Sequence, residues 1–404
     1  MKLKKVISMT LITAMTAALL AGCGNEEAET NTGSGFDSQP IVTVTDEPAQ
    51  TADAPAEEPE ALEMPEGYYA SELTGLPTPI EIKDQRPIAV MIDNESTALP
   101  HYEVAEADIV YELMNSTAND RVTRLMCIRK DWKSIKQMGS FRSTRPTNIP
   151  LAGEYNAILI HDGGPFYIND YIAKAYCDHL SGGFCRFDNG KNWEFTEYVT
   201  AEPTQGKTLN GGTTTYDGLI QRIASANISP TYNSYAPKRD THFILRDYGI
   251  DMTLTEMGYT DVMTANDISI GTFKHTQSAL KYNPETSTYD FYLYGNIQKD
   301  AEDGEVVSFN NVFLQCADFH QYDEHGYLVY MYMSTELDQN KYAGYYITNG
   351  EAIKVFWQRP IPDPYLDYDI TKFYDMDGNE IQINPGKTYI GMVPSDGWST
   401  VSIK

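Results

Sequence analysis

Basic residues are scarce in this 404-residue chain, which has 30 Lys and Arg against 57 Asp and Glu and a formal net charge of −27 at pH 7. Proteins that bind nucleic acids or anionic lipid headgroups do so through clustered Lys and Arg, and a strongly acidic protein repels both. We therefore expect no nucleic-acid partner. We also expect that any attachment to a membrane depends on something other than a basic patch.

Metal-binding and catalytic motifs are also missing. The five cysteines include no CxxC pair, and no Cys and His residues have the spacing of a zinc site. There is no GxSxG nucleophile elbow, no HExxH motif and no phosphate-binding P-loop. The sequence thus predicts no metal and no cofactor. It leaves enzymatic activity undecided while favouring a protein that is not an enzyme.

The sequence also lacks an apolar run of the length that a membrane-spanning helix needs, because the apolar stretch at residues 6–20 is too short. Three lysines precede this stretch and Leu20-Ala21-Gly22-Cys23 follows it, which is the layout of a secretory signal with a small-residue cleavage site. A cysteine directly after the cleavage site forms a lipobox, the signature of bacterial lipoproteins. We predict that residues 1–22 are a signal peptide and that the Cys23 sulfur carries diacylglycerol.

Lipidation of Cys23 places the protein on the extracytoplasmic face of a bacterial cell membrane, where two acyl chains suffice for stable anchoring. An uncleaved anchor and an ordinary signal peptide with an incidental cysteine are the alternatives, and both also keep the protein outside the cytoplasm. A host with one membrane and a host with two both fit this prediction.

An acidic segment follows the lipobox. Residues 24–66 contain twelve Asp or Glu, no Lys or Arg, and repeated Pro, Ala and Thr. Low hydrophobicity with charge of one sign is typical of disordered chains, because such a segment has too little apolar surface to bury. A flexible chain of this length spans roughly 35 Å root-mean-square. We predict that residues 23–66 are the lipidated cysteine and a tether that holds a folded body off the membrane.

The rest of the chain divides into two parts by its pattern. In residues 67–226, short apolar runs predict strands, and apolar residues at helical spacing between them predict helices. Residues 227–404 hold 19 of the 29 tyrosines, and strand-like runs there alternate with turn signals such as Asn349-Gly350 and Asp377-Gly378. We expect an α+β protein in which a mixed α/β layered domain is followed by a predominantly β domain.

The individual elements follow from the same patterns. The predicted helices are residues 166–176 and 216–226. The predicted strands are residues 88–92, 107–113, 123–129, 157–161, 289–294, 312–319, 327–333, 345–348, 352–358 and 388–393.

Polar side chains gather in the first part, several of them where a predicted strand ends, which is where side chains are presented over a sheet. Arg142 and Arg145 offer planar guanidinium forks for a phosphate or carboxylate. His161 is a candidate acid or base, and Gly163-Gly164 lets a ligand approach the backbone. The candidate ligand-binding residues are Asp93, Asn94, Glu112, Arg124, Arg142, Ser143, Arg145, His161, Gly163 and Gly164.

A structural role is the alternative for each of these residues. Arginines after apolar strands often pair with acids, here Asp108 and Glu112. A histidine at a strand end is often a satisfied hydrogen-bond partner, and two glycines often make only a turn. Ser143 lies near the arginines but has no obvious local base, so the sequence identifies no catalytic residue.

Three further features also have two interpretations. Cys177 and Cys185 are close enough in sequence to form a disulfide in an oxidising compartment, or they are free thiols. Residues 375–380 have part of a calcium loop without its full ligand spacing, so an Asp-Gly hairpin is the better interpretation. The tyrosines, with Trp357 and Trp398, either stack on sugar rings or simply pack on half-exposed strands.

These motifs resemble those of the YerB-like lipoproteins, domain-of-unknown-function family 3048. The resemblance covers most of residues 67–404 and implies a lipid-anchored protein with an α/β part followed by a β part. It implies no activity, because the family has none established. The chain departs from the family pattern at residues 115–122, 139–141 and 289–291. The matching stretches are residues 86–94, 105–112, Thr123-Arg124, 141–146, His161 with Gly163-Gly164 and, more weakly, Asn311-Val312 and 384–389.

The sequence is compatible with two functions. The favoured one is a non-catalytic binding or scaffolding lipoprotein of the cell envelope, whose partner is an envelope glycan, an anionic ligand or a membrane protein. The alternative is an envelope enzyme that acts on a phosphate-containing or glycan substrate through Arg142, Arg145 and His161.

Overall fold

The computed structural model describes residues 59–404, except residues 237–241, 323–328, 332–342 and 360–369. The predicted signal peptide, the lipidated Cys23 and most of the predicted tether lie outside the described residues, as does most of the predicted strand 327–333. None of the helices in the described ranges is long and apolar enough to cross a membrane.

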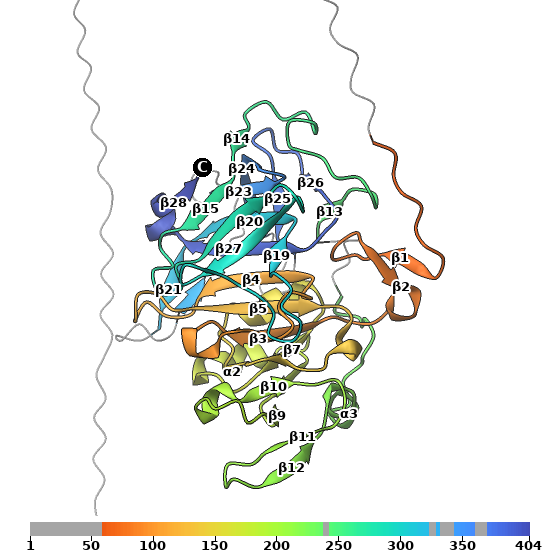
Figure 1. Cartoon of the computed structure of the whole chain (residues 1–404), viewed down its shortest axis with the longest axis vertical. Helices are drawn as coiled ribbons and strands as arrows, with labels where there is room; N and C mark the ends of the chain where they lie inside the picture. The colour runs from red at the N-terminus through yellow and green to blue at the C-terminus, as the bar shows by residue number, and fades with distance from the viewer. Residues whose placement is uncertain (1–58, 237–241, 323–328, 332–342, 360–369) are drawn as a thin grey trace, which may run out of the picture. The chain divides into compact units, whose positions relative to one another are not determined.

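An eleven-stranded sheet forms the centre of the structure (Figure 1). Its strand order is β14-β24-β23-β20-β27-β4-β5-β3-β7-β8, and β25 pairs with β24. The first part of the sequence supplies β3 (Ile88–Asp93), β4 (Ile109–Met114), β5 (Thr123–Arg129), β7 (Ile158–His161) and β8 (His179–Ser181). The second part supplies β14 (Met263–Thr264), β20 (Asn311–Ala317), β23 (Ala343–Thr348), β24 (Glu351–Gln358), β25 (Lys372–Tyr374) and β27 (Thr388–Pro394).

The central strands β3, β4, β5, β20 and β27 are buried along their whole lengths. A strand that is covered on both faces reads as a nearly continuous apolar run, which explains the pattern seen in the sequence. Strands β3, β4, β7, β8, β20 and β27 all run in one direction, and β5 is antiparallel between β3 and β4. The carboxyl ends of these parallel strands therefore meet at one edge, which we call the carboxyl edge.

A six-stranded sheet packs against β27. In β17, the buried residues Tyr289, Phe291 and Leu293 alternate with half-exposed ones, as in a strand with one covered face. The rings of Phe291 and Phe309 both lie 5.5 Å from the ring of Tyr389 on β27, so aromatic side chains fill the layer between the sheets. The strands of this sheet are β15 (Asp267–Ile270), β16 (Ala279–Asn283), β17 (Thr288–Leu293), β18 (Asn296–Ile297), β19 (Ser308–Phe309) and β28 (Val401–Ile403).

The opposite face of the large sheet meets α1 (Asn148–Glu154). The hydroxyls of Tyr111 on β4 and Tyr155, which follows α1, lie 2.7 Å apart. Consecutive side chains of a strand point to opposite faces, so Tyr111 faces α1 and Glu112 faces the second sheet.

Short elements complete the fold. The other helices are α2 (Asn169–Ile172), α3 (Leu219–Ser225) and the 3-10 turns η1 (Ile80–Ile82), η2 (Ser96–Ala98), η3 (Trp132–Ser134), η4 (Phe166–Ile168), η5 (Trp193–Phe195) and η6 (Ser395–Thr400). The small sheets are formed by β1 (Tyr68–Ala70) with β2 (Pro77–Pro79), β10 (Glu197–Val199) between β6 (Met138–Gly139) and β9 (Cys185–Arg186), β11 (Thr204–Lys207) with β12 (Thr213–Tyr216), β13 (Ile244–Leu245) with β26 (Gln382–Ile383), and β21 (Phe319–Gln321) with β22 (Val329–Met331).

The strand-rich character of the protein is as predicted, but an α/β layering of the first part is not confirmed. The α-helices of the described part have only 7, 4 and 7 residues. The predicted helix at 166–176 is the turn η4 followed by the four-residue α2, because Gly164 and Pro165 enter it and Asn169 and Asp170 are exposed. The predicted boundary between residues 226 and 227 divides the sequence by its pattern. In the structure, strands from both parts share one sheet.

The last residues of the predicted tether lie against the body. The backbone N–H of Leu62 donates to the carbonyl oxygen of Tyr248 at 2.8 Å. Leu62 also packs over Gly249, where a Cβ would collide with it. Contact with the body therefore begins before Gly67, the residue at which the sequence pattern places it.

A buried carboxylate, Glu112, joins the two sheets. Its Oε1 accepts hydrogen bonds from the hydroxyls of Thr123 and Ser278, both at 2.6 Å, and its Oε2 accepts one from Tyr389 at 2.7 Å. Asn94 Nδ2 and the Thr276 hydroxyl donate more weakly at 3.2 and 3.3 Å. Burial raises the pKa of Glu112 above its ordinary value, and these donors oppose that rise.

Replacing Glu112 should destabilise the protein strongly. Glu112→Ala leaves the hydroxyls of Thr123, Ser278 and Tyr389 without their acceptor inside the protein, and we expect a loss of about 3 kcal/mol or more in the free energy of unfolding. Glu112→Gln keeps one acceptor oxygen and should lose less. Urea denaturation at neutral pH measures both, with the exposed Glu285→Ala as a control expected to change stability by less than about 0.5 kcal/mol. Wild-type stability in Glu112→Ala would contradict this role.

Candidate functional site

The candidate residues are sorted onto two faces of the large sheet near its carboxyl edge. Asp93, the last residue of β3, lies opposite Arg124 of β5 in the strand register, so both side chains share one face. Asn94 contacts Glu112 on the other face. The structure therefore brings Asp93 and the arginines together and places Glu112 and Asn94 between the sheets, in a structural role.

Three arginines, Arg124, Arg142 and Arg145, form what we call the guanidinium site. Arg142 Nε lies 3.3 Å from Asp93 Oδ2, and Arg142 Nη1 donates to Glu194 Oε2 at 2.8 Å. Arg124 Nη1 donates to the carbonyl oxygen of Ser143 at 2.7 Å, which positions the segment that carries all of Arg142, Ser143 and Arg145.

Two of these guanidinium groups retain unused donors. Arg145 Nη1 donates to the carbonyl oxygen of Thr144 at 2.9 Å, but the buried Nε atoms of Arg124 and Arg145 have no hydrogen-bond partner. Burial, opposed by Asp93 and reinforced by Arg142, lowers the pKa of Arg124 to about 10. Burial and the neighbouring arginines lower the pKa of Arg145 to about 9. Both groups still carry their charge at neutral pH. Carboxylates offset the charge of Arg124 and Arg142, whereas only the other two arginines act on Arg145, so the uncompensated positive charge lies at Arg145.

A small pocket opens at these two arginines. It has room for about one water molecule, so it admits one oxygen atom of an anionic group. Its lining residues are Leu113, Met114, Asn115, Arg124, Arg145, Thr147 and Asn148.

His161 lies at the end of β7 and is 2% exposed. Its Nδ1 lies 2.7 Å from the carbonyl oxygen of Gly163, which can only accept, so Nδ1 carries the proton. Nε2, 3.1 Å from His179 Nδ1, then accepts a hydrogen bond from that histidine. Burial lowers the pKa of His161 to about 4, so the ring is neutral at pH 7 with both nitrogens bonded. This is the arrangement of a satisfied hydrogen-bond partner.

The two glycines shape the loop after β7. Gly163 has a φ of +68° and accepts the hydrogen bond from His161, so it makes the turn. A Cβ at Gly164 would lie 3.3 Å from the carbonyl oxygen of Thr144, the oxygen that binds Arg145. Gly164 thus brings the loop after β7 against the guanidinium site.

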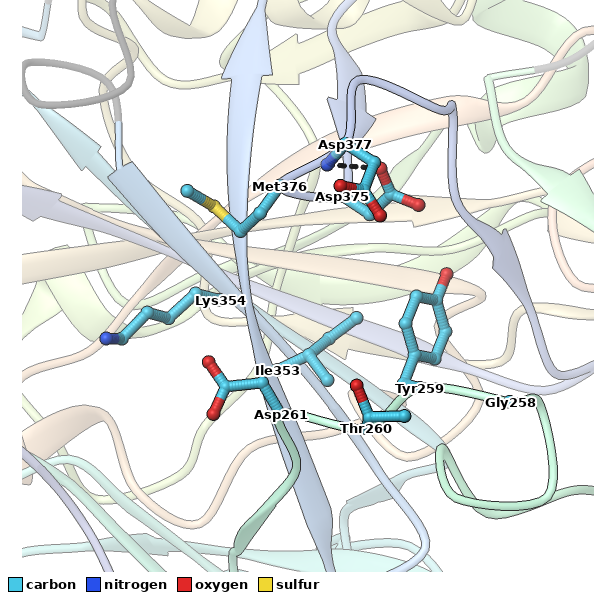
Figure 2. A pocket seen from close by; sticks show the side chains of 9 residues that line it. All are labelled: Gly258, Tyr259, Thr260, Asp261, Ile353, Lys354, Asp375, Met376 and Asp377. Atoms are coloured by element: carbon cyan, nitrogen blue, oxygen red, sulfur yellow. Dashed lines mark hydrogen bonds between the residues drawn. The ribbon is translucent and has the colours of Figure 1, made fainter. Parts of the chain in front are cut away.

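Residues 375–380 form a hairpin turn in which the Asp375 carboxylate accepts backbone hydrogen bonds. Asp375 Oδ1 accepts hydrogen bonds from the backbone N–H groups of Asp377 and Asn379, both at 2.9 Å. Figure 2 shows Asp375 and Asp377 at one side of a pocket, with Asp261, Lys354 and Tyr259 at the other. Within the described residues, the only three potential metal ligands that lie close together are the side chains of Glu106, Asp303 and Glu305, and two of these residues are exposed. This group includes no residue of the hairpin. The hairpin interpretation is therefore favoured over a calcium loop.

The disulfide considered for Cys177 and Cys185 is absent. Both are free thiols, as are Cys127 and Cys316. Cys177 precedes β8 in the large sheet, whereas Cys185 begins β9 in a different sheet. The predicted sugar-stacking tryptophans are also placed otherwise: Trp357 is fully buried and Trp398 stacks on Tyr345.

Two neighbours of the site were not predicted. Glu194 pairs with Arg142, and His179 bonds to His161, across 52 and 18 residues of sequence respectively. Neither residue carries a local motif. Only the strand pairing, which sets β7 beside β8, could have indicated His179.

Comparisons with known proteins all point to the same protein family. A family profile described as "Protein of unknown function (DUF3048) N-terminal domain" matches residues 73–214, and its C-terminal domain profile matches residues 268–390. The chain is 24% identical over 339 residues to a Bacillus subtilis (strain 168) protein named "Putative lipoprotein YerB", which covers 82% of this chain and 88% of that protein. The crystal structure of the YerB protein from Bacillus subtilis has the same fold, with a TM-score of 0.60 and 20% identity over 83% of this chain and 99% of that one.

The low pKa of His161 predicts a dependence of stability on pH. Below pH 6.5 the unfolded chain binds a proton at this histidine that the folded protein takes up only near pH 4, so stability falls as the pH is lowered through that window. The loss is at most about 1.4 kcal/mol per pH unit from this group. His161→Asn retains a donor for Gly163 and should make the fall in melting temperature shallower than in the wild type. The exposed His320→Asn is the control, and identical slopes in all three proteins would contradict the assignment.

Proposed function

Because the chain belongs to the DUF3048 family of proteins of unknown function, as its motifs predicted, we propose its function from its own site. We infer that it is a lipid-anchored protein of the bacterial cell envelope that binds an anionic group at the guanidinium site and catalyses no reaction. Its partner is an envelope glycan, an anionic ligand or the anionic part of a membrane protein.

The observation that carries this proposal is the pair of unpartnered Nε atoms on Arg124 and Arg145. A buried donor without an acceptor costs about 1 to 3 kcal/mol, and more when it is charged. Asp93 lies on the same face as Arg124, but the guanidinium group of Arg145 contacts only a backbone oxygen, although the protein has 57 acidic side chains. An incoming phosphate or carboxylate would offer an acceptor to these donors and a counter-charge to Arg145.

The position of the site supports the same proposal. Ligands of open sheets bind outside the carboxyl ends of parallel strands, where loops present backbone and side-chain groups. The guanidinium site lies at the carboxyl edge, beside the ends of β3 and β4 and the start of β5. The segment 141–146, which carries part of the family motif, supplies Arg142 and Arg145, and Gly164 packs against Thr144 of that segment.

Anchoring is supported by the sequence and by the name of a relative. The Bacillus subtilis protein is named a lipoprotein, and Cys23 of this chain stands directly after a predicted cleavage site. The predicted signal peptide, residues 1–22, and diacylglycerol on Cys23 would place the body on the extracytoplasmic face of the membrane.

Catalysis through Arg142, Arg145 and His161 has less support. A general acid or base must reach the proton that it transfers and titrate near the working pH. Both nitrogens of His161 are engaged by Gly163 and His179, and burial holds its pKa near 4. These contacts favour binding over acid–base chemistry at this residue.

Binding of an inorganic anion tests the proposal. Phosphate or sulfate in millimolar amounts should raise the melting temperature of the full-length protein in detergent, because a ligand that binds only the folded state stabilises it by mass action. Arg145→Gln and Arg124→Gln should abolish the rise. A concentration of one hundred times the dissociation constant corresponds to about 2.7 kcal/mol of stabilisation.

Lys207→Gln is the matched control. Lys207 lies on β11 and pairs with Asp188 at 3.0 Å, so its replacement removes the same charge away from the site. This variant should keep the full response to phosphate. An equal response in Arg145→Gln, Arg124→Gln and the wild type would show that the anion binds elsewhere.

Membrane attachment has a separate test. Cys23→Ser removes the sulfur that would carry diacylglycerol, and we expect the variant to move from the membrane fraction to the soluble or secreted fraction. Fractionation followed by Triton phase partitioning measures this shift. Cys177→Ser, which changes a free thiol of the body, is the control and should stay with the membrane. Retention of Cys23→Ser in the membrane would contradict lipid anchoring.

A further inference from the structure

An unusual row of aromatic side chains lies beside the guanidinium site. Phe166 is 71% exposed, and its ring centroid lies 3.9 Å from that of Tyr167. Tyr167 stacks on Tyr322 with centroids 4.6 Å apart, and His320 lies 4.9 Å from Tyr322. We call Phe166, Tyr167, Tyr322 and His320 the aromatic row. Phe166 and His320 are exposed and the two tyrosines are half-buried. An exposed apolar ring that continues a group of aromatic side chains often marks a binding surface.

The chain itself holds the row close to the arginines. Gly164 packs against the carbonyl oxygen of Thr144, which accepts the hydrogen bond from Arg145 Nη1. Phe166 follows Gly164 by two residues, so their Cα atoms lie within about 7 Å of each other. The row therefore begins beside the guanidinium site.

A second contact ties the far end of the row to the same edge. The Thr117 hydroxyl, in the loop after β4, donates to Gln321 Oε1 at 2.8 Å. That loop begins at Asn115, which lines the pocket at Arg124 and Arg145. Gln321 lies between His320 and Tyr322 in the sequence. The pocket and the row thus share the carboxyl edge.

We propose that the anionic group bound at the guanidinium site is carried by a carbohydrate whose ring packs on the aromatic row. This inference rests on the anion binding proposed above. The pocket admits only one oxygen atom of the anionic group, so the rest of the ligand must lie outside it, over exposed side chains. A sugar ring has an apolar face that packs on an aromatic ring and hydroxyls that remain hydrated, and it therefore suits an open, half-exposed row.

The anion of such a carbohydrate is a phosphate or a carboxylate, because the guanidinium fork binds both. A nucleobase also stacks on aromatic rings, so a nucleotide is the competing ligand that the test must separate from a carbohydrate. Three probes distinguish these ligands: a hexose monophosphate for a sugar phosphate, glucuronate for a sugar carboxylate, and adenosine monophosphate for a nucleotide.

Calorimetric titration of the full-length protein in detergent tests the proposal with these three probes, inorganic phosphate and glucose. We expect the hexose monophosphate or glucuronate to bind about 3- to 10-fold more tightly than inorganic phosphate, as one added aromatic contact allows. Phe166→Ala should remove that advantage and leave the affinity for inorganic phosphate unchanged. Tyr68→Ala, which changes a half-exposed tyrosine on β1, should retain it.

The outcomes separate this inference from the proposed function. Inorganic phosphate that binds while neither sugar binds more tightly, or a sugar advantage that survives in Phe166→Ala, overturns the carbohydrate and leaves the anion site standing. A larger advantage for adenosine monophosphate overturns the carbohydrate in favour of a nucleotide. The proposed function itself is overturned if the wild type binds no phosphate, or if Arg145→Gln binds phosphate as tightly as the wild type does.

Discussion

The parallel pairing of β4 with β27 is the constraint on which the rest of the structure depends. It joins strands almost 280 residues apart and sets Glu112 opposite Gly391, so that the Glu112 carboxylate meets the Tyr389 hydroxyl at 2.7 Å. The second sheet then supplies Ser278 to the same carboxylate. A shift of one residue in this register would turn Glu112 toward α1 and leave it without these donors, so the hydrogen bonds and the strand register specify each other.

The same register determines where the functional groups lie. With Glu112 fixed between the sheets, Arg124, which pairs with Leu113, must face the opposite side together with Asp93. The alternation of side chains along β3 and β5 therefore separates the Glu112 carboxylate, which has several donors, from the arginines, two of which keep an unpartnered Nε. A buried network with every donor occupied stabilises the fold, whereas donors without partners indicate a ligand.

Much of the fold could be predicted from the sequence, and the reason is local. Strand β5 was predicted at its observed bounds, Thr123–Arg129, because a strand covered on both faces has an apolar pattern visible in seven residues. The Asn349-Gly350 hairpin was also predicted, since both residues take positive φ values in a tight turn. The predicted helix at 166–176 was wrong in length, because apolar spacing there reflects Ile168 packing under the loop and not a continuous helix. The candidate list mixed Glu112 with Arg124 because the sequence places one near the end of a strand and the other near the start of the next, but does not show which face each side chain takes.

The opposition between the global and the local charge restricts what the site can bind. The formal net charge of −27 repels polyanions at long range, but this repulsion is screened over about 8 Å at physiological ionic strength. The buried guanidinium groups of Arg124 and Arg145 act at contact distance, where screening is weak. A ligand with many charges is therefore repelled before it arrives, whereas one anionic group on a largely neutral molecule meets little long-range repulsion and gains the contact. The aromatic row at Phe166 is consistent with that requirement, because it offers apolar surface to the neutral part of such a ligand.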